Sequence, residues 1–236
     1  MNSRTMLVSL GMAGLLAGAV GGVAPPASAA APPLVAGGTN YNWYKLNGCD
    51  REPYGVVQNY DQAKSTIDRQ LQAIYDSGQR RLNIAMFHIH GVEDGTLMNS
   101  AGGKLTPKDH KNLADLLAEM KHIGFPKVVI TMNPEGANLP TNPDYDPSTY
   151  DENFSFLKDV RSVAVASGEP YTIDLYDEVI PENDPNNPGQ VNALNYSTRL
   201  WADYTKAFGK ADTTGFSIIG GDPLRFASLA KVYQGN

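Results

Sequence analysis

The segment EPYTIDLYDEVIPEN, residues 169–183, has the pattern that most clearly indicates the fold. Its first half alternates apolar and polar side chains with the period of two that a β-strand imposes. The two faces hold Tyr171, Ile173 and Leu175 on one side and Thr172, Asp174 and Tyr176 on the other. Asp177 and Glu178 follow where the strand should end, and Pro181 closes it. The pattern predicts a strand with one carboxylate in its middle and two at its exit.

Strand patterns of this kind alternate with helical patterns along the chain. Strands are predicted at 37–46, 80–88, 126–134, 169–176 and 213–221, and helices at 60–78, 106–124, 146–168, 189–209 and 222–233. The second helix shows its signals most fully, with Thr106 as N-cap, Pro107 at the first helical position and Gly124 as the stop. Strand–helix alternation without hairpin signals predicts parallel strands joined by helical crossovers.

Two α/β architectures fit this order. One is a (β/α)8 TIM barrel, and the other is an open doubly wound sheet. Strands at the centre of a doubly wound sheet are continuous apolar runs, because helices cover both faces. Here polar Arg81 and Asn83 oppose apolar Leu82 and Ile84. We therefore expect a fold of the (β/α)8 TIM-barrel type, partial, with about five β/α units in this chain.

Composition narrows the class of protein. The chain has 236 residues, 42% of them hydrophobic, and a formal charge of −6. These values are typical of one soluble globular domain, and the acidic balance gives no basis for a nucleic-acid or anionic-membrane partner. Cys49 is the single cysteine, so no internal disulfide can form. A buried thiol, an intermolecular bridge and a missing partner remain open for it.

Residues 1–30 have the pattern of a secretory signal peptide. Arg4 precedes an apolar run, and Ala27-Ser28-Ala29 matches a cleavage site. We expect cleavage after Ala29 or Ala30, which leaves residues 31–236 as the mature domain. The localisation that this predicts is secreted or extracellular, with no membrane association after cleavage.

Candidate site residues gather at the predicted strand ends, because barrel enzymes place their active sites at the C-terminal ends of the strands. The set comprises Asn42, Trp43, Tyr44, His88, His90, Asn133, Glu135, Tyr176, Asp177, Glu178 and Asp222. Aromatic rings stack on the apolar faces of sugars, while amides and acids bind hydroxyl groups. Glycoside hydrolysis needs two carboxyl groups, one of them a proton donor. By alternation Glu178 should point into the barrel interior, as a general acid would.

Three segments resemble the cellulase-like glycoside hydrolases of family five and their clan. They are GGTNYNWYKL (37–46), RLNIAMFH (81–88) and IDLYDEVIP (173–181). The resemblance implies that Glu178, ending the fourth strand, is the acid/base residue. In the clan an asparagine that helps bind the sugar 2-hydroxyl precedes this glutamate, and Asp177 stands there instead. The predicted substrate-binding residues are Asn42, Trp43, Tyr44, His88, Asn133, Tyr176 and Asp177.

In the clan, the second glutamate is the nucleophile and ends the seventh strand. Only five strands are predicted here, so no residue of this sequence can be given that role. We therefore expect weak or no hydrolysis by the chain as it stands, with sugar binding possible. Two classes remain open, a retaining glycosidase and a non-catalytic carbohydrate-binding remnant. His88 and His90 form an H-x-H pair that binds metal in amidohydrolase barrels. That family also needs two later histidines and a late aspartate. The four histidines here are at positions 88, 90, 110 and 122, and none follows, so neither metal nor cofactor is expected.

Overall fold

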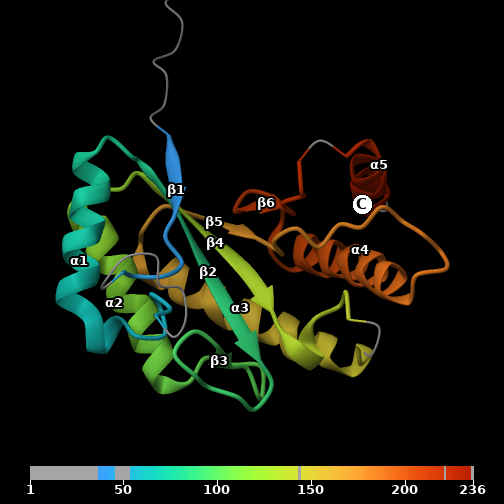
Figure 1. Ribbon diagram of the computed structural model, residues 1–236, viewed down its shortest axis with the longest axis horizontal. Helices are drawn as coiled ribbons and strands as arrows, with labels where there is room; N and C mark the ends of the chain where they lie inside the picture. Colours follow the sequence, from blue (N-terminus) through green and yellow to red (C-terminus); the bar gives the residue numbers. More distant parts are fainter. Residues whose placement is uncertain (1–36, 46–53, 143–144, 221, 235–236) are drawn as a thin grey trace, which may run out of the picture. The chain divides into compact units, whose positions relative to one another are not determined.

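Parallel strands in chain order build the sheet of this protein (Figure 1). The computed structural model describes residues 37–45, 54–142, 145–220 and 222–234. The strands are β1 (Gly38–Asn40), β2 (Arg81–Ile89), β3 (Met98–Asn99), β4 (Lys127–Pro134), β5 (Tyr171–Asp174) and β6 (Thr213–Gly215). The helices are α1 (Tyr60–Asp76), α2 (Pro107–Ile123), α3 (Tyr150–Ser167), α4 (Pro188–Phe208) and α5 (Pro223–Gln234), with short 3-10 turns at Gly136–Asn138 and Pro147–Thr149.

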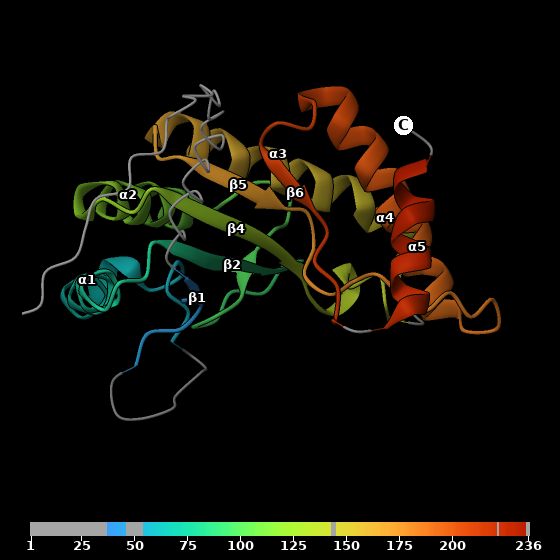
Figure 2. The same cartoon turned by 90° about the horizontal axis from the view of Figure 1, so that it is seen from above.

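The strand order is β1-β2-β4-β5-β6, and β3 pairs with β2 beside this path. Every pairing between these strands is parallel. Right-handed crossovers between successive strands place their helices on one face of the sheet, and α1 to α4 follow one side of the strands (Figure 2). A doubly wound sheet requires the strand order to reverse at a switch point. Among the described strands the order does not reverse. The described strands therefore show no switch point of a doubly wound sheet, and the predicted parallel α/β fold is confirmed.

One hydrophobic core fills the space between the sheet and these helices. The strands contribute Leu82, Ile84 and Met86 from β2, Val128, Ile130 and Met132 from β4, and Ile173 from β5. The helices contribute Ile67 and Leu71 from α1, Leu113, Leu116, Leu117 and Met120 from α2, and Phe156, Leu157 and Val160 from α3. The period-two and helical patterns in the sequence predicted these faces, because each element buries the side chains that its own geometry aligns.

The opposite face of the sheet is polar. Asn83 of β2 accepts a hydrogen bond of 2.7 Å from the Thr131 hydroxyl of β4 and donates one of 3.1 Å to Asn40 of β1. An open groove of about 530 Å³ runs along this face, lined by Gly38, Thr39, Asn40, Arg81, Leu82, Asn83 and Val129. The polar side chains predicted by alternation therefore lie on the face that the helices leave uncovered.

Local signals fixed most helix ends. The Thr106 side chain accepts a hydrogen bond from the Asp109 amide, and Gly124 ends α2 in the left-handed conformation. Asp222 accepts one from the Leu224 amide at the start of α5, as its predicted capping role requires.

The first and last strands are much shorter than predicted, and β5 covers only Tyr171–Asp174 of the predicted 169–176. The strand expected at 37–46 pairs only over Gly38–Asn40, because the chain then turns and Trp43 forms an antiparallel bridge with Gly55. The strand expected at 213–221 pairs only to Gly215, which adopts a positive φ of 79°. The predicted signal peptide and Cys49 lie outside the described residues. Within the described ranges no helix is long and apolar enough to cross a membrane.

Candidate functional site

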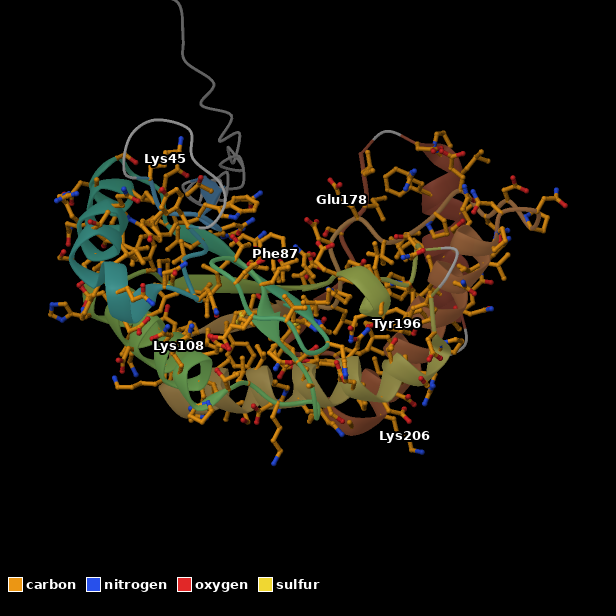
Figure 3. All side chains as sticks on the ribbon, turned by 60° about the horizontal axis from the view of Figure 1, so that its bottom comes forward. Lys45, Phe87, Lys108, Glu178, Tyr196 and Lys206 are labelled. Atoms are coloured by element: carbon orange, nitrogen blue, oxygen red, sulfur yellow. The ribbon has the colours of Figure 1, made fainter. Side chains whose placement is uncertain are left out.

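Glu178 lies in a turn, so the strand alternation that predicted an interior direction for its side chain does not extend to it. β5 ends at Asp174, and Asp177 and Glu178 lie exposed in a turn beyond it. Glu178 has a φ of 53°, a left-handed conformation that is uncommon for residues other than glycine. Figure 3 shows its side chain projecting from this loop on the side of the sheet where Phe87 also lies. The period of two cannot be carried past Asp174, because the backbone there is no longer extended.

Asp174 is the buried carboxylate of this region. Its side chain lies on the face opposite the core residue Ile173, and the residue is 5% exposed. Asp174 Oδ1 accepts a hydrogen bond of 3.2 Å from the Ser217 amide, and Oδ2 lies 2.6 Å from the Ser217 hydroxyl. Burial raises the pKa of Asp174 to about 6, although the bonds from Ser217 oppose the rise.

Ser217 joins this buried carboxylate to the exposed one. Its hydroxyl lies 2.8 Å from Asp177 Oδ1 as well as close to Asp174. Ser217 follows β6, whereas both aspartates belong to β5 and the loop after it. The three residues therefore tie the loop that carries Glu178 to the end of the neighbouring strand. Sequence reasoning missed Ser217, because nothing in the local pattern distinguishes it from any loop serine.

Among the predicted sugar contacts three rings are buried, and the Asn133 amide is 9% exposed. His88 is 1% exposed and stacks on Phe156 of α3, with ring centroids 4.4 Å apart. It shares the strand face of the core residue Met86, so its ring points to the helix layer. Tyr44 packs edge-on against Tyr54 at 5.3 Å in the same core.

Tyr176 is the third buried ring among the predicted sugar contacts, with 5% of the residue exposed. It packs edge-on against Tyr196 of α4 with centroids 6.1 Å apart, and burial raises its pKa further above its ordinary value. The predicted substrate contacts of His88, Tyr44 and Tyr176 do not fit these positions, because their rings are used in packing.

Other predicted residues do lie together on the helix-free face. The half-buried ring of Trp43 stacks on that of Phe87 at 5.2 Å. Phe87 is the parallel-register partner of Asn133, so ring and amide occupy adjacent strands. Asn42 is also half-buried, and its side-chain oxygen has no hydrogen-bond partner among the described residues. Phe87 was not predicted as a site residue, although it shares strand parity with Asn83.

The H-x-H pair is divided by the alternation of β2. His90 lies beyond the strand end, where its Nδ1 is 2.7 Å from Glu152 of α3. Glu152 also accepts hydrogen bonds from Ser100 and Asn138, so it joins two loops to the start of α3. Throughout the described ranges no three His, Cys, Asp or Glu side chains come close enough to hold a metal ion.

No protein-family model matches the chain, and a search of the curated proteins returns no match to it. An aromatic pair and an amide share the helix-free face of the sheet, and a loop with two exposed carboxylates follows the neighbouring strand. Such a surface can bind a polyhydroxylated ring and offer it a proton.

Proposed function

We propose that this protein is a secreted, glycoside hydrolase-like protein that acts on O-glycosidic bonds of a polysaccharide or oligosaccharide. We further propose that the sheet is part of a (β/α)8 barrel wall. Two features support the barrel, namely the sequential order of parallel strands and the polar face that the helices leave uncovered. In barrels that face is the interior, and its C-terminal rim carries the active site.

One observation carries the proposed function. The Trp43–Phe87 stack lies on the helix-free face, Asn133 is the next side chain across the sheet, and the β5 loop follows on the adjacent strand. Neighbouring strands lie about 4.8 Å apart, so the stack and the β5 loop are separated by roughly 10 Å. A sugar chain resting on the aromatic pair would therefore reach the carboxylates of the loop.

Glu178 takes the acid/base role in this proposal. Its carboxyl projects from the loop into solvent, where a leaving oxygen can approach it. As the bond from the anomeric carbon to that oxygen breaks, the Glu178 proton passes to the oxygen. Water then supplies the hydroxyl group at the anomeric carbon, and its other proton returns to the Glu178 carboxylate. Asp174 is unsuited to this contact, because it is buried and both of its carboxylate oxygens face Ser217.

A non-catalytic carbohydrate-binding protein is the second candidate. The aromatic stack and Asn133 can bind a sugar without any contribution from Glu178, so this surface supports binding on its own.

The experiment compares hydrolysis and binding in the same preparations. In a chain extended to eight β/α units, Glu178→Gln should abolish most hydrolysis of a glycoside with a poor leaving group, by roughly 10²-fold or more, and cost much less with an activated aryl leaving group. Glu182→Gln is the matched control, because Glu182 is a half-exposed acid of the same loop that contacts Arg225. Trp43→Ala should weaken oligosaccharide binding in both candidates. Binding without turnover selects the second candidate, and neither binding nor turnover on a panel of glycans rejects both.

A further inference from the structure

The Ser217 hydroxyl faces two carboxylate oxygens but has one hydrogen. Its oxygen lies 2.6 Å from Asp174 Oδ2 and 2.8 Å from Asp177 Oδ1. A hydroxyl donates once, and an ionised carboxylate only accepts. If both aspartates are ionised, one of the two contacts has no hydrogen of its own. Both contacts become full hydrogen bonds when one carboxyl group carries a proton.

Burial decides which carboxyl group holds that proton. Asp174 is 5% exposed, whereas Asp177 is exposed to solvent. Among the described residues, β4 presents Thr131 to Asp174 in register, the β6–α5 loop presents Ser217, and α5 contributes Tyr233, none of which is a cation. The Tyr176 amide also donates a hydrogen bond to Asp174. The remaining charged neighbour is Asp177, which opposes ionisation of Asp174.

Arg225 of α5 contacts the far end of the same loop. Its guanidinium donates to the Ile180 carbonyl and lies 3.6 Å from Glu182 and 3.5 Å from Asp222. These contacts hold Arg225 at positions 180–182, and they do not depend on the Asp174 proton.

We propose that Asp174, Ser217 and Asp177 form a one-proton clamp that positions the loop carrying Glu178. In the closed clamp the Asp174 carboxyl donates to the Ser217 oxygen, and the Ser217 hydroxyl donates to Asp177. When Asp174 loses its proton, one link opens, and the turn at Asp177–Glu178 is released from β6. Asp174 and Ser217 are thus positioning residues that make the placement of Glu178 depend on pH.

The closed clamp helps to hold the strained backbone turn at Glu178. Glu178 has a left-handed φ of 53°, a conformation that costs a non-glycine residue free energy and persists only where its surroundings hold it. Asp177 is its immediate neighbour and contacts β6 through Ser217. The inference rests on the proposed function only for the role of Glu178, since the clamp itself is a property of the folded chain.

The test uses the whole chain and no substrate. Hydrogen exchange of the amides at 175–180 is measured from pH 4.5 to pH 8 and divided by the intrinsic rate at each pH. Carboxyl carbon shifts of the aspartates are followed by NMR over the same range. We expect Asp174 to titrate near pH 6, and loop protection to fall roughly tenfold across that titration, as loss of one ordinary hydrogen bond implies.

Two variants fix the clamp in opposite states. Asp174→Asn keeps an acceptor for the Ser217 amide and supplies a permanent donor to its hydroxyl, so the loop should stay protected at every pH. Ser217→Ala removes the link, so the loop should exchange fast at every pH. Ser162→Ala is the control, because this serine bonds only the Asp159 carbonyl of its own helix and should behave as wild type.

Several outcomes overturn the clamp. A single hydrogen shared between two ionised carboxylates would leave the wild-type loop protected at pH 8. Loop exchange that Ser217→Ala does not change would show that Ser217 does not hold the loop. If Asp174→Asn does not fold, Asp177→Asn replaces it, because its amide can also donate to Ser217, and pH-dependent protection in that variant contradicts the proposal. None of these results depends on glycosidase activity, so the clamp and the proposed function fail separately.

Discussion

The imidazole of His88 stacks on the ring of Phe156, with centroids 4.4 Å apart and ring planes inclined by 28°. One ring comes from β2 and the other from α3, so the contact joins the sheet to its helix layer. Complete burial lowers the pKa of His88 to about 3, which keeps the ring neutral in the folded protein. An unfolded histidine titrates near 6.5, so the unfolded chain binds a proton in mild acid that the fold excludes.

The first prediction concerns acid stability. Because the folded pKa of His88 is lowered, its contribution favours folding above pH 6.5 and is lost progressively as pH falls toward 3. His88→Phe keeps a ring against Phe156 but removes the titration. Relative to wild type at each pH, the variant should gain about 2 kcal/mol of unfolding free energy between pH 7 and pH 5. Urea unfolding at both pH values measures this, and a pH-independent difference would refute it.

The second prediction concerns Asp174, which behaves in the opposite sense. Its folded pKa of about 6 lies above the ordinary aspartate value, so its stabilising contribution is present in acid and is lost as pH rises through 6. The unfolding free energy of wild type minus that of Asp174→Asn should fall by about 2 kcal/mol from pH 4 to pH 7. Chemical denaturation of both proteins across this range provides the measurement, with a flat difference as the contrary result.

The third prediction concerns Asp212, which lies at the N-terminal ends of strands β5 and β6. Asp212 accepts hydrogen bonds from Arg161, Tyr171 and Tyr204 at 2.8, 2.9 and 2.8 Å, which joins β5 to α3 and α4. Asp212→Asn leaves Arg161 without its carboxylate and should cost about 3 kcal/mol of stability.

The matched control for Asp212→Asn is Asp115→Asn. Asp115 pairs with Lys111 on the exposed surface of α2, so this change should cost less than about 0.5 kcal/mol. Thermal unfolding of both variants at pH 7 compares the two losses. Equal losses would mean that the Asp212 contacts contribute no more than a surface pair.

The fourth prediction concerns Gly215, where β6 ends. Its φ is 79°, and a Cβ added there would lie 2.1 Å from the Tyr233 hydroxyl oxygen. That hydroxyl accepts a hydrogen bond from the Phe216 amide, so Gly215→Ala would displace it as well as strain the backbone. We expect a loss of about 2 kcal/mol or more. Gly220→Ala meets no atom within 4 Å and serves as the control, and similar melting temperatures for both variants would contradict the prediction.

Local sequence patterns were enough to predict the helices, the strands and their parallel order. Thr106, Pro107 and Gly124 mark the ends of α2 through hydrogen bonds within a few residues, so their effect is readable locally. The alternation in β2 and β4 assigned Ile84 and Ile130 to the core, because strand geometry fixes the face of each side chain. Strand–helix alternation then left parallel crossovers as the arrangement that joins these elements.

The ends of the strands and the contacts between distant side chains depend on the tertiary structure. β5 stops at Asp174, where its pairing with β6 shifts register, so Glu178 lies in a turn although the alternating pattern continues to Tyr176. Ser217 meets Asp174 across 43 residues of chain, and His88 meets Phe156 across the sheet–helix interface. Register and interface contacts depend on partners distant in the sequence, and a local pattern carries no information about those partners.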